Sequence, residues 1–104
     1  MIYRLKRKSD FDKLFSKGKK GFSKSLTMLY FPSNEFKIGY SVSKKHGNAV
    51  KRNKIKRLLR ASARVAFSDL KKNYRIVILP KVRDEYSFDT FVADLNYLKK
   101  KENL

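Results

Sequence analysis

Hydrophobic residues recur along this chain with a helical period in some segments and with a strand period of two in others. The first helical pattern covers residues 10–16, where Phe11, Leu14 and Phe15 are spaced to share one face. Ser9 is suited to cap the start of this helix, and Gly18 stands where a left-handed C-cap residue is common. The basic stretch over residues 17–24 is expected to be an exposed loop.

Two segments with alternating hydrophobic and polar positions follow, at residues 25–31 and 36–43. The alternation predicts two strands, and the Pro-Ser-Asn-Glu run at 32–35 has the composition of a tight turn. We therefore expect the two strands to pair as a β-hairpin. One face of this hairpin is strongly apolar and needs a cover, whereas the other face is shallow because it carries small or hydroxylated residues, namely Thr27, Gly39, Ser41 and Ser43.

A long helix is predicted from Asn48, its N-cap, to about residues 68–72. The apolar run from Tyr74 to Leu79 ends at Pro80 and predicts a buried strand. Ser87 is then suited to cap a last helix with hydrophobic residues at helical spacing. The predicted order is α-β-β-α-β-α, an α+β fold that we expect to form one domain over residues 1–104.

The long helix separates its residues into two faces when it is wound at about 100° per residue. The apolar face holds Ile55, Leu58, Leu59, Ser62, Val65 and Ala66. The opposite face holds Asn53, Lys56, Arg57, Arg60 and Arg64, with Arg52 and Lys54 at its borders. No acidic residue occurs between residues 47 and 68. A solvated helix face normally mixes charges of both signs, because like charges at this spacing repel by a few tenths of a kcal/mol per pair.

The whole chain is strongly basic as well, because 27 Lys and Arg against nine Asp and Glu give a net charge of +18. Such an excess repels itself and favours a polyanionic partner. A helix on a membrane surface would place aromatic residues at its polar borders, and this helix lacks them. The sequence has no cysteine, no long apolar run and no apolar stretch of a signal peptide near its start. We therefore expect a nucleic-acid-binding protein of the cytoplasm, without membrane contact.

Residues 39–60 read G-Y-S-V-S-K-K-H-G-N-A-V-K-R-N-K-I-K-R-L-L-R. This run closely resembles the signature of the bacterial ribonuclease P protein subunit, G-x-S-V-x-K-K-x-G-N-A-V-x-R-N-x-x-K-R-x-x-R. The flanking elements are also similar, so the resemblance covers nearly the whole chain. It implies a two-layer, ribosomal-protein-like α/β sandwich with a left-handed β-α-β crossover at the basic helix, although crossovers are generally right-handed.

The resemblance also implies a function. Proteins of this family assist a catalytic RNA that removes the 5′ leader from precursor tRNA, so the expected partners are that RNA subunit and precursor tRNA, with one protein per RNA. Mg²⁺ is expected to be bound chiefly by the RNA. By position, the residues expected to bind the RNA subunit are Lys44, Lys45, Arg52, Asn53, Lys56, Arg57, Arg60 and Arg64. The residues expected to line a cleft for the single-stranded leader are Phe11, Phe15, Thr27, Leu29 and Ser41.

Two questions about the cleft stay open in the sequence. The family usually adds an aromatic residue from the strand before the turn, but the register places Leu29 on the cleft face and turns Tyr30 the other way. Phe11 and Phe15 also have the spacing of ordinary core residues, and on spacing alone core packing is the favoured interpretation.

Two other function classes compete with this assignment. A self-sufficient nuclease would need a paired general acid and base, whereas His46, the only histidine, is expected to be a solvent-facing loop residue without an acidic partner. We therefore predict no catalytic residue and no metal ligand in the protein; Asp84, Glu85 and Asp89 are too few and too local for a magnesium site. A structural ribosomal protein would be equally basic and similar in fold. The signature around Arg52, Asn53, Lys56 and Arg57 favours the ribonuclease P family, and a test of tRNA processing would discriminate the two.

Overall fold

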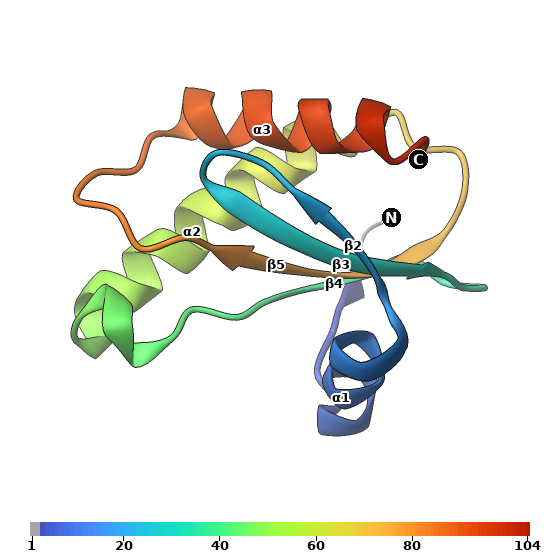
Figure 1. The fold of residues 1–104 in the computed structure, drawn as a ribbon, viewed down its shortest axis with the longest axis horizontal. Coiled ribbons are helices and arrows are strands. Elements are labelled where there is room, and N and C mark those ends of the chain that lie inside the picture. The colour runs from blue at the N-terminus through green and yellow to red at the C-terminus, as the bar shows by residue number, and fades with distance from the viewer. Residues whose placement is uncertain (1–2) are drawn as a thin grey trace.

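The computed structural model describes residues 3–104, which form a five-stranded mixed sheet with helices on both faces (Figure 1). In chain order the elements are β1 (Tyr3–Arg4), α1 (Lys8–Lys17), β2 (Lys19–Phe22), β3 (Leu26–Pro32), β4 (Lys37–Tyr40), the 3-10 turn η1 (Lys44–His46), α2 (Ala49–Ala66), β5 (Tyr74–Pro80) and α3 (Phe88–Lys101). The α+β class is confirmed. Helices α2 and α3 form the expected two-layer sandwich with the sheet, and α1 adds a partial third layer on the opposite face.

The predicted hairpin between the strands at 25–31 and 36–43 is wrong. The strand order is β1-β4-β5-β3-β2, so β5 lies between β3 and β4. It pairs antiparallel with β3 and parallel with β4. The physical reason is burial: Ile76, Val77 and Ile78 of β5 are all fully buried, and a strand that is apolar on both faces is stable only at the centre of a covered sheet.

The hairpin that does form joins β2 to β3, with Phe22 paired to Thr27 and Lys19 paired to Tyr30. Residues 17–24 are therefore not the loop predicted from their glycines and lysines, since four of them form the edge strand β2. Lysine-rich composition suits an edge strand because exposed charges discourage pairing with another chain. Strands β4 and β5 are joined through α2, which gives the expected β-α-β crossover. Its left-handedness stays a prediction.

The helix starts agree with the sequence at α2 and α3 but not at α1, and α2 ends at Ala66, before the predicted 68–72. The Oδ1 of Asn48 accepts a hydrogen bond from the backbone N–H of Lys51 at 2.9 Å, and the Ser87 hydroxyl oxygen accepts one from Thr90 at 3.1 Å. Ser9 is not the N-cap, because α1 begins at Lys8. Arg7 occupies the N-cap position, and its side chain makes no capping hydrogen bond.

Gly18 also differs from the prediction, since its φ of −67° and ψ of 148° are extended and not left-handed. A Cβ at this position would come within 2.6 Å of the Leu14 carbonyl oxygen. Glycine is therefore required here because the chain passes close to the end of α1, and not because the backbone adopts a positive φ.

The core has one part on each side of the sheet. On the α2–α3 side, Leu59 and Phe91 are fully buried against the sheet, together with Ile55, Ala63, Ala66, Leu95 and Leu98. On the α1 side, Leu14 packs with Leu5, Leu29 and Val77. Val65 does not belong to the buried face of α2 as predicted, because it is 53% exposed and Ala63 takes its place.

Candidate nucleic-acid interface

The cations of α2 remain uncompensated by acidic groups. Arg57 and Arg64 are exposed, and Arg60 is half-buried on the same side. The other predicted residues of this face are likewise exposed or half-buried, namely Arg52, Asn53, Lys54 and Lys56. Residues 3–104 contain two ion pairs, Arg75–Asp10 and Lys99–Asp69, and neither involves α2. The helix therefore presents its positive charge to solvent, as the sequence predicts.

The turn η1 adds Lys44 and Lys45, both exposed, just before the start of α2. Gly47 connects the turn to the helix with a φ of +119°, a conformation that side chains disfavour. This glycine therefore lets the chain reverse tightly, and the two lysines extend the basic surface beyond the N-cap of α2.

His46 is buried, which contradicts its predicted place in solvent. Its Nε2 lies 3.0 Å from the Pro80 carbonyl oxygen, and its Nδ1 lies 3.3 Å from the Ser43 hydroxyl and 3.2 Å from the Ser43 carbonyl oxygen. The ring thus ties η1 to the end of β5. Sequence reasoning could not find this, because the partner is 34 residues away. Both ring nitrogens are occupied within the fold, so His46 orients the turn and offers no free base.

Tyr40 joins this surface to the sheet. The side chain is half-buried, and burial raises its pKa to about 12, while the nearby guanidinium groups of Arg60 and Arg64 act in the opposite direction. The sequence marks position 40 only as a variable residue of the signature. Its place beside two arginines follows from the packing of α2 on the sheet.

On the opposite face of the sheet, α1 covers one part and leaves another open. Leu29 points to the α1 side and Tyr30 to the α3 side, where its hydroxyl donates to Glu102 at 2.7 Å, as the predicted register requires. Leu29 is only 3% exposed, so it belongs to the core beneath α1. Thr27 is half-buried on the same face.

The two aromatic residues of α1 are not equivalent. Phe11 is half-buried over Gly39, where an added Cβ would come within 2.6 Å of its ring. The first glycine of the signature therefore makes room for this ring. Phe15 is 45% exposed, which is unusual for a core residue of that size. Ser41 lies beyond β4 and is half-buried, so the predicted cleft residues gather on one face with Phe11 and Leu29 packed and the others accessible.

Sequence reasoning missed an aromatic residue on this face. Phe31 lies two residues beyond Leu29 and is therefore on the same side of the strand, half-buried. The ammonium of Lys13 stands 5.2 Å from its ring centre. The strand period alone could have identified this residue.

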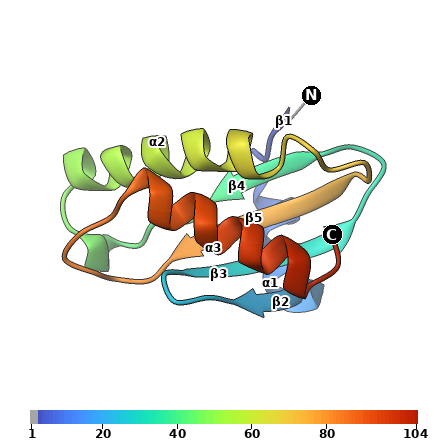
Figure 2. The same ribbon diagram turned by 90° about the horizontal axis from the view of Figure 1, so that it is seen from above.

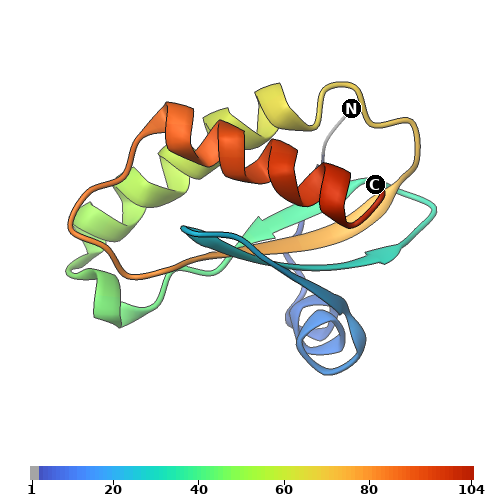
Figure 3. The same ribbon diagram turned by 45° about the horizontal axis from the view of Figure 1, so that its top comes forward.

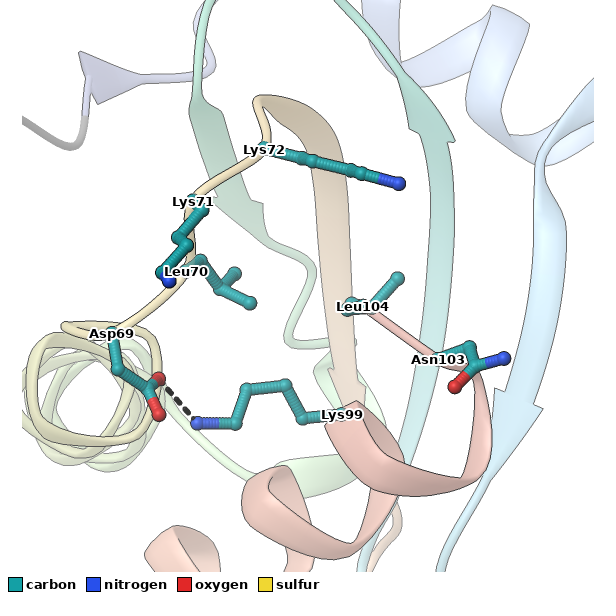
Figure 4. Close-up of a pocket in the computed structure, with 7 residues that line it drawn as sticks. All are labelled: Asp69, Leu70, Lys71, Lys72, Lys99, Asn103 and Leu104. Atoms are coloured by element: carbon teal, nitrogen blue, oxygen red, sulfur yellow. Dashed lines mark hydrogen bonds and ion pairs between the residues drawn. The ribbon is translucent and has the colours of Figure 1, made fainter.

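A separate hollow of about 300 Å³ lies between the end of α2 and the end of α3 (Figure 4). Its lining residues are Asp69, Leu70, Lys71, Lys72, Lys99, Asn103 and Leu104. Lys99 donates to the Ala66 carbonyl oxygen at 2.5 Å and pairs with Asp69 at 2.6 Å, and this hydrogen bond lowers the pKa of the Asp69 carboxyl. Lys99 thus holds the end of α2. The hollow contains none of the predicted site residues.

Residues 3–104 contain no cluster of three or more His, Cys, Asp or Glu side chains that could hold a metal ion. Over the same residues, no helix has the length and apolar character needed to cross a membrane. Asp84, Glu85 and Asp89 do not form such a cluster.

The α+β fold carries an uncompensated cationic helix on one side of a mixed sheet and an exposed aromatic ring, that of Phe15, on the other. This combination is typical of a nucleic-acid-binding protein. The family model for ribonuclease P matches residues 2–103. The chain therefore belongs to the ribonuclease P protein family, whose members are the protein component of a ribonucleoprotein endoribonuclease of tRNA processing.

Individual relatives agree with this assignment. The chain is 38% identical to the ribonuclease P protein component of Clostridium botulinum, over 96% of this chain and 89% of the relative. It is 36% identical to that of Caldanaerobacter subterraneus, over 99% and 91%. The solved RNase P proteins of Staphylococcus aureus and Thermotoga maritima superpose with TM-scores of 0.82 and 0.81, each at 28% identity. These superpositions cover 96% and 93% of this chain, and 94% and 96% of the respective structures.

Proposed function

We propose that this chain binds the catalytic RNA subunit of ribonuclease P through the exposed face of α2 and the lysines of η1, and the 5′ leader of precursor tRNA through the cleft beside α1. The observation that carries the proposal is the row of cations on α2 without an acidic partner. Arginine suits this role because its planar fork can bridge two phosphate oxygens. One such face per chain fits one protein per RNA subunit.

The RNA subunit, with Mg²⁺ bound chiefly to it, carries the hydrolysis in this proposal. Two observations support that division of labour. Both nitrogens of the single histidine are occupied by contacts with Ser43 and Pro80. Acid–base catalysis needs two groups that exchange protons with the substrate, and neither face described above offers such a pair. The protein's part is to bring two negatively charged RNAs together in the cytoplasm.

The cleft suits a single-stranded leader of variable sequence. Aromatic rings stack on any base, and Phe15 offers an exposed ring on the face of the sheet that also carries the half-buried Thr27 and Ser41. Phe11 supports the cleft from below, because it packs tightly over Gly39.

The test is cleavage of precursor tRNA at low magnesium by the cognate catalytic RNA, with and without the purified protein. We expect the protein alone to be inactive and the complex to cleave at the 5′ end much faster than the RNA alone. No stimulation of this reaction would instead favour a structural ribosomal protein.

A second measurement addresses the cleft. Phe15→Ala should weaken the binding of precursors that carry a leader and leave the binding of mature tRNA unchanged, since only the leader contacts the ring. Equal losses for both would mean that the substitution damaged the core and that the cleft is misassigned.

A further inference from the structure

We propose that Phe22 of β2 and Tyr97 of α3 form an additional stacking site for unpaired RNA bases, which extends the leader cleft across the sheet to the β2 edge. This inference rests on the proposed function of the cleft. The ligand is the distal part of a single-stranded 5′ leader, recognised by its bases' flat faces and its phosphates.

The strand register connects the cleft to Phe22. Ser41 lies beside Leu79, because its N–H donates to the Ile78 carbonyl oxygen at 2.9 Å. Leu79 is paired with Thr27, and Thr27 with Phe22. All four side chains face the α1 side. Side chains two residues apart on a strand point the same way, and Ser41, Leu79 and Thr27 each lie two residues from a position that packs on the α1 side, namely Gly39, Val77 and Leu29. Phe22 faces that side because it pairs with Thr27.

This row crosses four strands, a span of roughly 14 Å at about 4.8 Å per strand. Two members of the row, Ser41 and Thr27, are cleft residues already. Helix α1 lies on this face of the sheet, away from the β2–β3 turn (Figure 1). Leu79 packs against the core on the α1 side, whereas the Phe22 ring is exposed at the other end of the row. Phe22 therefore continues the same surface outward.

The Phe22 ring faces the α1 side and Tyr97 comes from α3 on the opposite side of the sheet, but both residues line one hollow at the edge strand β2. Their side chains are 52% and 53% exposed. The hollow measures about 550 Å³ and is completed by Ser23, Lys24 and Asp94. The Asp94 carboxylate is engaged by the N–H and hydroxyl of Ser25. Aromatic faces with a wet, open border are the form that base-stacking sites take.

Cations surround the pair. Lys24 lines the hollow, and Lys20 lies two residues before Phe22 on the same side of the strand. The Lys101 ammonium stands 5.7 Å from the Tyr97 ring centre. A second copy of this chain would bring the same charge of +18, so a polyanion is the favoured occupant.

The β2–β3 turn is held in place by two cations from the segment that follows β5. Lys81 donates from its ammonium to the Ser23 carbonyl oxygen at 2.6 Å, and Arg83 donates to that of Lys24 at 2.5 Å. These bonds fix the end of β2 on the scaffold. Phe22 is thus presented on a rigid turn, and a rigid ring loses little freedom when a base stacks on it.

The experiment uses the complex of the protein with its cognate catalytic RNA and a series of precursor tRNAs whose leaders are shortened one nucleotide at a time. Phe22→Ala should weaken the binding of long-leader precursors about 5- to 20-fold, from the lower half of the range for base–aromatic stacking. The loss should vanish below a threshold leader length, and mature tRNA should bind as before. Tyr97→Ala should show the same dependence on length.

Matched variants separate stacking from packing. Phe22→Tyr keeps an aromatic face and should bind like the unmodified protein, whereas Phe22→Leu keeps apolar bulk and should lose affinity as Phe22→Ala does. Phe88→Ala removes the same ring from a partly exposed site outside the hollow and should have no effect that depends on leader length.

Each other outcome overturns the inference in a recognisable way. A leader-dependent loss in Phe15→Ala without one in Phe22→Ala leaves the cleft intact and removes its extension. Losses that are equal at all leader lengths assign Phe22 to folding or to the RNA subunit. A change in oligomeric state without any leader effect assigns the hollow to a second copy of the chain. No leader effect in any variant removes the proposed cleft itself.

Discussion

Helices α2 and α3 lie side by side on one face of the sheet, and they use their charges in opposite ways (Figures 2 and 3). Both begin at a side-chain N-cap and both bury an apolar stripe. Charged groups of α3 and of its C-cap are bonded inside the fold: Asp94 accepts from Ser25, the C-cap Glu102 accepts from Tyr30, and Lys99 holds the end of α2. The cations of α2 have no acidic partner within residues 3–104.

This difference teaches how a small, highly basic protein can fold stably and still bind RNA. Helix α3 supplies core and internal polar contacts, so the self-repulsion concentrated on α2 is tolerated. The unpaired charge of α2 is then available to a polyanion, and bound RNA relieves the repulsion that the free protein carries.

The largest effect on stability is expected from a substitution in the buried stripe of α3. Phe91→Ala on α3 removes a fully buried ring and should lower the free energy of unfolding by about 3–5 kcal/mol, because a cavity remains. Denaturant titration measures this loss. Phe88→Ala, at a side chain that is 37% exposed, should cost much less. Similar costs at the two positions would contradict the core role of α3.

The next effect concerns RNA affinity. Arg57→Ala with Arg60→Ala should weaken binding to the catalytic RNA by about tenfold for each arginine, as for charged hydrogen bonds. The slope of log affinity against log salt should fall by about one unit for each phosphate that the variant no longer neutralises. The control, Lys71→Ala with Lys100→Ala, removes equal charge from exposed positions off α2. Equal losses of affinity in both variants would mean that only net charge matters.

The stability of the protein at alkaline pH depends on two tyrosines packed on the α2–α3 side of the sheet, Tyr30 and Tyr40. Burial raises the pKa of Tyr30 and that of Tyr40 to about 12, from an ordinary value of 10. Each neutral phenol therefore stabilises the fold fully below pH 10, and this contribution is lost as the pH rises from 10 to 12. Tyr40→Phe should reduce the loss of unfolding free energy across that window.

The arginines of α2 act on only one of these phenols. Arg60→Ala with Arg64→Ala should raise the pKa of Tyr40 further and leave Tyr30 unchanged, because the opposing cations disappear only near Tyr40. Phenolate absorbance in the Tyr30→Phe and Tyr40→Phe backgrounds assigns each titration. A shift of both tyrosines would show that the effect is not local.

The smallest effect on stability is expected from a substitution that adds an acidic partner to α2, as an ordinary solvated helix would have. Ala61→Glu places a carboxylate at an exposed position between Arg57 and Arg64 and should stabilise the protein by about 0.2–0.5 kcal/mol per pair formed. The same change should weaken RNA binding, whereas Ala61→Gln should do neither. Tighter RNA binding in Ala61→Glu would overturn the role of the unpaired cations.

Local sequence determined the elements whose signals are short in range. The start of α2 at Asn48, the start of α3 at Ser87 and the strand over 74–80 follow from caps and periodicity, because the interacting groups lie within a few residues. The charged face of α2 follows in the same way from about 100° per residue. Its end was predicted too late, since Lys99, from another helix, binds the last turn at Ala66.

Tertiary structure decided everything that depends on a distant partner. The turn after β3 reverses the chain, but only the insertion of β5 separates β3 from β4. The burial of His46 depends on Pro80, and the place of Phe22 beside the cleft depends on a pairing that the basic composition of β2 concealed. A chain can encode where its helices begin and which side is charged through neighbouring residues alone, whereas strand order and side-chain burial are settled by contacts between residues far apart in the sequence.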